Sequence, residues 1–153
     1  MEGCRSVSNP STTTVVCPRR GLTRDGRLYP CRSPENCVST SSIRTPEKLG
    51  TPWEYSSQTN DADKAFASLI AAVEGTKGVS LKEIDTSSRY LWAEFPSKVP
   101  QDGVDDVEFL LKPSDNMVLY RSASRRTIFV YPLQRPLSDQ GNNKERLEGG
   151  LHR

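Results

Sequence analysis

The chain has 153 residues with 34% apolar content, 11 prolines and 10 glycines, so it can form one cored domain only if long polar segments lie outside the core. Residues 1–48 carry eight basic and four acidic groups, residues 54–120 carry six and twelve, and residues 121–153 carry seven and three. Because the expected core region is acidic, we predict no nucleic-acid partner. No apolar run approaches the roughly 20 residues that span a bilayer, so we predict no transmembrane segment.

The first part of the chain, residues 1–60, contains all four cysteines and shows no helical periodicity. We expect extended or irregular chain there, with Trp53 and Tyr55 packing against the core. The opening residues 1–27 are rich in Ser, Thr and Arg, a composition that is typical both of a disordered arm and of part of an organelle transit peptide.

An amphipathic helix is the first periodic element of the chain. In NDADKAFASLIAAVEG, apolar residues recur at the spacing of one helix face: Ala62, Ala65, Phe66, Leu69, Ile70 and Val73. Asn60 or Asp61 can cap its start, and Gly75 can end it in a left-handed turn.

Strand patterns follow this helix. Alternating, β-branched and aromatic residues predict strands over residues 79–84, 89–95, 105–111, 117–124 and 127–131. The turn residues after position 111 predict that the third and fourth strands form an antiparallel hairpin. A short last helix is expected from Asp139 or Asn142 to about Glu148. The order predicts a single α+β domain, with an antiparallel sheet of four to five strands covered on one face by the amphipathic helix.

Charged residues alternate with apolar ones in the predicted strands, so that the apolar sets face the helix and Glu94, Asp106 and Glu108 gather on the second face. A one-residue change of register would decide whether Arg121 joins these acids. The acids together with Arg121 and Arg125 either line a pocket for a polar ligand or form a cross-strand ion-pair network on a solvated face. The pattern favours the network.

Several catalytic arrangements have no candidates in this sequence. The only histidine is His152, next to the last residue, which leaves no credible base for a serine or cysteine nucleophile and no histidine-rich metal site. Neither GxGxxG nor a Walker loop occurs. We therefore predict no catalytic residues, no metal site and no cofactor.

Two of the cysteines, Cys31 and Cys37, lie in PCRSPENCVS with five residues between them, which is not the C-x-x-C spacing of zinc knuckles or redox motifs. They can close a small disulfide loop, or both can remain reduced, since oxidation depends on the compartment. Of these two states, we predict the disulfide.

Five motifs occur in order along the chain: CRSPENCVST, RYLWAEF, VDDVEFLL, YRSASRR and SDQGNNKERLE. Together they resemble the family called domain of unknown function 1499, over about residues 28–148. GLTRDGRLYPC and the insertion TIFVYPLQRPL are similar to the plastid branch of that family, some members of which are thylakoid-lumenal. The chain departs from the pattern at the inserted Glu35 and at its end, GGLHR, where relatives continue a helix.

The resemblance implies a domain at residues 28–148, between an arm at 1–27 and a tail at 149–153, and a chloroplast location with the thylakoid lumen as the candidate compartment. It implies no mechanism. We hypothesise that Arg121 and Arg125 bind the carboxylates of neighbouring strands, because a planar guanidinium can meet a carboxylate through two hydrogen bonds. The family motifs fall on Cys31, Cys37, Glu94, Asp105, Asp106, Glu108, Arg121, Ser122, Ser124, Arg125, Asp139 and Asn143.

Two functions of different classes remain open. The first is a non-enzymatic binding or assembly module for a protein partner, which fits the lack of catalytic residues and the aromatic and proline segments around Trp53 and Tyr131. The alternative is a small polar-ligand binder or hydrolase-like enzyme that uses Glu94, Asp106, Glu108, Arg121 and Arg125. A concave pocket around those side chains would favour the alternative.

Overall fold

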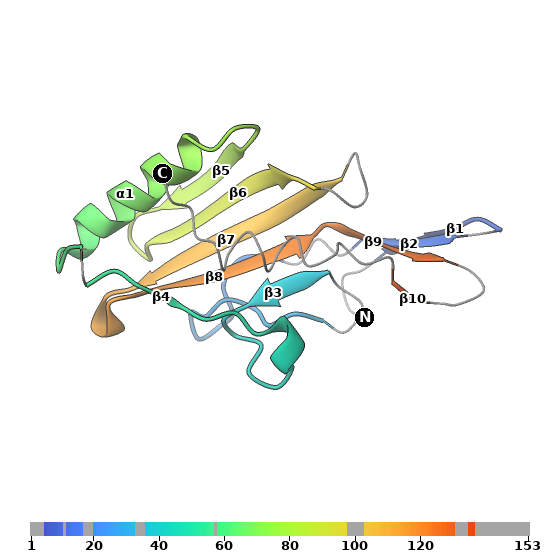
Figure 1. The fold of residues 1–153 in the computed structure, drawn as a ribbon, viewed down its shortest axis with the longest axis horizontal. Coiled ribbons are helices and arrows are strands. Elements are labelled where there is room, and N and C mark those ends of the chain that lie inside the picture. The colour runs from blue at the N-terminus through green and yellow to red at the C-terminus, as the bar shows by residue number, and fades with distance from the viewer. Residues whose placement is uncertain are drawn as a thin grey trace.

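The computed structural model describes residues 5–10, 12–16, 20–32, 36–56, 58–97, 103–130 and 135–136. These residues form one domain with ten strands and one α-helix (Figure 1). In chain order the elements are β1 (Arg5–Ser8), β2 (Thr12–Val16), β3 (Cys37–Ser39), the 3-10 helix η1 (Pro46–Lys48), β4 (Trp53–Glu54), α1 (Ala62–Glu74), β5 (Ser80–Asp85), β6 (Tyr90–Pro96), β7 (Val104–Lys112), the 3-10 helix η2 (Pro113–Asp115), β8 (Met117–Ser124), β9 (Arg126–Val130) and β10 (Arg135–Pro136).

Six of these strands form the main sheet, which is antiparallel throughout. Its order is β3-β8-β7-β6-β5, and the short β4 also pairs with β8. The predicted hairpin of β7 and β8 is confirmed, since the two strands pair over their whole length around η2. The predicted number of four to five strands was too low, because β3 and β4 are too short to show an alternating pattern.

The helix α1 confirms the predicted amphipathic element. Asp61 caps its start, with its carboxylate accepting hydrogen bonds from the backbone N–H groups of Asp63 (2.9 Å) and Lys64 (3.3 Å). Gly75 ends the helix as expected, but its φ of −78° is right-handed, so the expected left-handed turn was wrong at that position. The left-handed conformation occurs three residues later, at Gly78, with φ of 81°.

The main hydrophobic core lies between α1 and the first face of the main sheet. The helix contributes Ala65, Phe66, Leu69 and Val73, all buried. The apolar positions of β6 and β7 face it, as the alternation predicted, and burying each such large side chain stabilises the fold by roughly 1.5–3 kcal/mol. Trp53 packs against Phe109 and Tyr120, with ring centroids 5.9 and 5.1 Å apart, and Tyr55 is buried in the same cluster.

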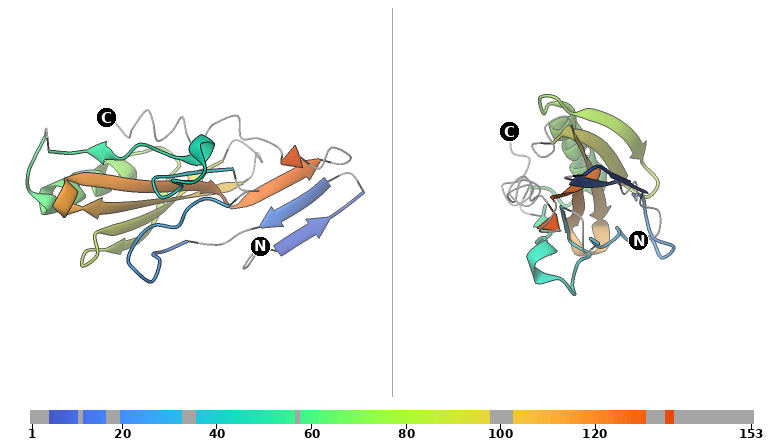
Figure 2. Two further views of the ribbon diagram at one scale, coloured as in Figure 1. Left: turned by 90° about the horizontal axis from the view of Figure 1, so that it is seen from below. Right: turned by 90° about the vertical axis from the view of Figure 1, so that its right-hand side faces the viewer.

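A second, small sheet has the order β1-β2-β9-β10 and is also antiparallel. It lies beyond one end of the main sheet, where β9 continues the chain after β8 (Figures 1 and 2). The prediction of extended or irregular chain did not include this sheet, in which β1 pairs with β2 and β2 pairs with β9 from the far end of the sequence. Tyr131 and the expected last helix lie outside the described residues.

The second face of the main sheet, called here the polar face, is covered by residues 20–32, which we call the strap. Leu28 of the strap is buried against Tyr90 and Leu110, with Leu22 beside it. The expectation of a sheet covered on one face only was wrong, since the strap covers the second face. The sequence did not reveal this covering layer because the strap has no helix or strand periodicity.

At one edge of the main sheet lies β5, which pairs only with β6 among the described strands. It carries the charged residues Lys82, Glu83 and Asp85, and its pairing register shifts between Leu81 and Glu83.

Candidate functional site

The register of the main sheet brings the predicted acids and arginines together. Glu108 of β7 is the direct partner of Arg121 on β8, and Glu94 of β6 is the direct partner of Asp106 on β7. All four therefore belong to the polar face. The sequence left the register between β7 and β8 open, and the structure places Arg121 rather than Ser122 beside the acids.

Glu108 and Arg121 form a buried ion pair at the centre of this face. Their side chains are 0% and 1% exposed, and the Arg121 Nη1 atom lies 3.6 Å from the Glu108 Oε1 atom. The other carboxylate oxygen, Oε2, accepts hydrogen bonds from the Tyr90 hydroxyl (2.7 Å) and from the Gly21 backbone N–H of the strap (2.7 Å). The pair was expected on a solvated surface, which was wrong, since the strap encloses it.

Burial also affects the protonation of Glu108. It raises the pKa of the Glu108 carboxyl, while the Arg121 charge and the hydrogen bonds from Tyr90 and Gly21 act in the opposite direction. Burial, together with the nearby Glu108 charge, also raises the pKa of the Tyr90 hydroxyl, which therefore stays protonated and donates to Glu108.

Arg125 directly follows β8 and joins the other two acids. Its Nε donates to Asp106 Oδ2 (3.0 Å), and its Nη2 donates to Asp106 Oδ1 (2.5 Å) and Glu94 Oε2 (2.7 Å). The hydrogen bond with Asp106 is the main cause that raises the pKa of the Arg125 guanidinium. Trp92 Nε1 also donates to Asp106 Oδ1 (3.0 Å), and Lys82 Nζ lies 3.6 Å from Glu94 Oε1.

Three further residues complete the site and were not predicted as members of it: Tyr90, Trp92 and Gly21. Tyr90 and Trp92 precede Glu94 by four and two positions in β6, so strand alternation puts all three on one face and could have found them. No local signal marks Gly21, because its contact with Glu108 joins residues 87 positions apart in the chain. The strap also places the Arg20 guanidinium 3.7 Å from the centroid of the Trp92 ring, in a cation–π contact.

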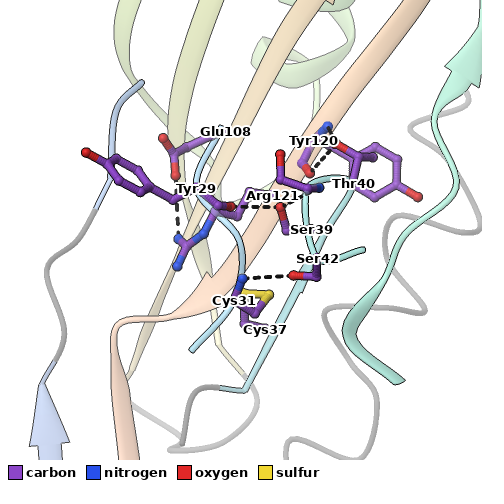
Figure 3. Close-up of a disulfide and its surroundings, with 10 residues drawn as sticks. Tyr29, Cys31, Cys37, Ser39, Thr40, Ser42, Glu108, Tyr120 and Arg121 are labelled. Atoms are coloured by element: carbon purple, nitrogen blue, oxygen red, sulfur yellow. Dashed lines mark hydrogen bonds and ion pairs between the residues drawn. A yellow bond between two sulfur atoms is a disulfide. The ribbon is translucent and has the colours of Figure 1, made fainter. Parts of the chain in front are cut away.

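Cys31 lies at the end of the strap, and Cys37 begins β3. Cys31 and Cys37 are joined by a disulfide, with their Cα atoms 5.7 Å apart. Around it, the Cys31 N–H donates to Ser42 Oγ (2.8 Å) and Ser39 Oγ donates to the Tyr29 carbonyl (2.8 Å) (Figure 3). The disulfide therefore ties the strap to β3, at the edge of the main sheet.

Other family positions lie near this cluster or outside the described residues. Asp105 is buried and is the strand partner of Ser124, and Ser122 is buried opposite Val107. Asp139 and Asn143 lie outside the described residues.

The chemistry open to this arrangement follows from its contacts. Every carboxylate of the cluster lies against an arginine of the same chain, and the central pair is sealed from solvent. Of the cluster's five charged side chains, Arg125 and Glu94 keep partial exposure, 31% and 24% respectively. In the described part of the chain, no group of three or more Cys, His, Asp or Glu side chains is placed to hold a metal ion. Within the same ranges, no helix has the length and apolar character needed to cross a bilayer.

These features define a single α+β domain whose antiparallel sheet carries a helix on one face and a disulfide-tethered strap over a charged cluster on the other. The chain matches the family described as a protein of unknown function (DUF1499) over residues 27–152, and it belongs to that family. The match confirms the family inferred from the five motifs. Comparisons with curated proteins and with solved structures found no match to this chain.

Proposed function

We propose that this protein is a non-enzymatic binding or assembly module. The observation that carries the proposal is that the acids and arginines of the cluster bind one another within the chain. Glu108 and Arg121 are sealed beneath the strap, and Asp106 is held by Arg125 and Trp92. A catalytic carboxylate has to reach a substrate, whereas these carboxylates hold three strands and the strap together.

A loop beside the disulfide is the surface that best suits a protein partner. It spans residues 40–50 and includes η1, below β3 in Figure 1. Within this loop, Ile43 is 75% exposed and Leu49 is 36% exposed. Binding residues are often found on loops that a rigid scaffold positions, and this supports a protein contact here.

Binding of a small polar ligand is the second candidate, and the partial exposure of Arg125 and Glu94 favours it. A carboxylate or phosphate group could meet the exposed part of the Arg125 guanidinium, although its Nε and Nη2 atoms already donate to Asp106 and Glu94.

For the compartment, we propose a plastid location, in the thylakoid lumen. The resemblance to the plastid branch motivates this proposal, and the disulfide supports it because disulfides persist in oxidising compartments. Alkylation of intact plastids followed by fractionation tests it. A protein found in the stroma with both thiols alkylated would contradict the lumenal assignment.

Affinity purification of tagged protein from chloroplast extract tests the function, with mass spectrometry of bound proteins and small molecules. We compare the natural chain with Ile43→Asp and with a matched control, Ile84→Asp, which alters another exposed isoleucine on β5. A stoichiometric protein partner should be retained by Ile84→Asp and lost from Ile43→Asp. A bound small molecule that is lost on Arg125→Ala, with no protein partner, would instead support the ligand-binding alternative.

A further inference from the structure

The strap is attached to the domain separately from the main core. None of its residues belongs to the cluster packed between α1 and the main sheet. Its own apolar contacts are those of Leu22 and Leu28 with the satellite cluster on the polar face. A segment with few buried apolar contacts can open while the rest of a domain stays folded, because its opening free energy is only part of the global one.

Both ends of the strap are fastened to the main sheet. Near its start, the Gly21 N–H donates to Glu108 and Arg20 stacks on Trp92. Near its end, the fastening is covalent, through the Cys31–Cys37 bond to β3. The neighbouring hydrogen bonds, from Cys31 N–H to Ser42 and from Ser39 to the Tyr29 carbonyl, depend on that end staying in place (Figure 3).

Beneath the strap lie two charges that water would solvate strongly. Glu108 and Arg121 are removed from solvent, and taking an ion pair out of water carries a large desolvation cost that their attraction only partly offsets. When the strap opens, water can hydrate the two charges again, and this hydration offsets part of the free energy that opening requires. The closed state is therefore opposed by the hydration of this pair and maintained by the fastenings of the strap.

We propose that the Cys31–Cys37 disulfide is a redox-controlled latch, which a dithiol reductant cleaves so that the strap leaves the polar face while the main core stays folded. Both cysteines are partly exposed, which gives a reductant access. Release of the strap uncovers Tyr90, Trp92 and the Glu108–Arg121 pair, so the reduced protein presents a different surface to its surroundings from the oxidised one.

The exchange step is balanced by the dithiol alone. One thiolate of the dithiol attacks one sulfur of the Cys31–Cys37 bond, forms a mixed disulfide and releases the other cysteine as a thiolate, which takes a proton. The second thiolate of the dithiol then attacks the mixed disulfide. The reductant leaves as its own disulfide, and two electrons and two protons have passed to the cysteine pair.

Hydrogen exchange with mass spectrometry tests the latch on the full chain in a Cys4→Ser/Cys17→Ser background, where Cys31 and Cys37 are the remaining cysteines. Three samples are compared: oxidised protein, protein reduced with dithiothreitol, and a Cys31→Ser/Cys37→Ser variant. Loss of a short cross-linked loop should speed exchange of strap peptides, including the Gly21 and Cys31 amides, on the order of tenfold or more. Peptides of α1 and β7 should change less than about twofold.

Two results would overturn the latch. One is strap exchange that is equal in the oxidised and reduced samples. The other is faster exchange of the strap, α1 and β7 together, which would make the disulfide a global stabiliser. If the Cys31→Ser/Cys37→Ser variant does not fold, the oxidised and reduced samples still test the latch, and reoxidation of the reduced sample should restore slow exchange.

Discussion

Glu108 and Arg121 face each other across β7 and β8, with their side chains enclosed by the sheet and the strap and 3.6 Å between Oε1 and Nη1. Removing one partner of such a pair leaves an uncompensated buried charge. We expect Glu108→Ala and Arg121→Ala each to lower the free energy of unfolding by about 3–5 kcal/mol. The double variant should lose less than the two losses combined, by roughly 0.5–3 kcal/mol, in urea denaturation.

A surface ion pair serves as the control for this double-mutant cycle of two single variants and one double variant. Arg89 Nη2 lies 2.9 Å from Asp63 Oδ1, but the Asp63 side chain is 85% exposed. The same cycle there should give a coupling of at most about 1 kcal/mol. Strictly additive losses at Glu108 and Arg121 would count against direct pairing.

The raised pKa of Glu108 predicts a pH dependence of stability. A carboxyl whose pKa is raised by folding holds its proton more tightly in the folded chain than in the unfolded one, where the ordinary value is 4.5. Its contribution is therefore complete below about pH 4.5 and is lost as the pH rises through the raised pKa. The unfolding free energy of the natural chain minus that of Glu108→Gln should fall over that window and stay constant below it. Urea denaturation at a series of pH values measures this difference, and a difference that grows with pH would mean that folding lowers the pKa.

Arg125 should tolerate neither alanine nor lysine. Arg125→Ala removes three hydrogen bonds to Asp106 and Glu94, and hydrogen bonds to charged groups contribute about 1.5–3 kcal/mol each when fully formed, less where solvent has access. Lysine keeps the charge but cannot bridge two carboxylates with a planar fork. We expect Arg125→Lys to recover less than about half of the loss in thermal denaturation. A lysine variant as stable as the natural chain would show that charge alone matters here.

Gly50 lies under the ring of Tyr120, which gives a steric prediction. A Cβ atom at position 50 would lie 2.5 Å from Tyr120 Cε1 and 2.8 Å from its hydroxyl oxygen, which donates to the Thr51 carbonyl at 2.6 Å. Gly50→Ala should therefore displace the ring and lower the free energy of unfolding by about 1–3 kcal/mol. In a Tyr120→Leu background the same substitution should be nearly neutral. An equal loss in both backgrounds would exclude the clash as its cause.

Local pattern was sufficient for those parts of the fold that depend on neighbours in the chain. The periodicity around Phe66 and Leu69 predicted α1, and the alternation in β6 and β7 predicted which residues face it. Asp61 was a correct capping candidate, because capping involves residues only two or three positions away.

The remainder depends on contacts between distant segments. To predict that Glu108 pairs with Arg121, one must know the register between β7 and β8. Residue types alone leave that register uncertain by one position. The strap was missed because Leu22 and Leu28 stand in a stretch without strand or helix periodicity. The pairing of β2 with β9 joins residues more than a hundred positions apart, such as Thr14 and Ile128.

The edge strand β5 limits how this protein can associate with others. Lys82, Glu83 and Asp85, together with the register shift after Leu81, interrupt the regular row of backbone donors and acceptors that an incoming strand would need. Growth of the main sheet by adding a strand from another molecule at this side is therefore disfavoured. Fibril-like self-association through β5 is disfavoured for the same reason.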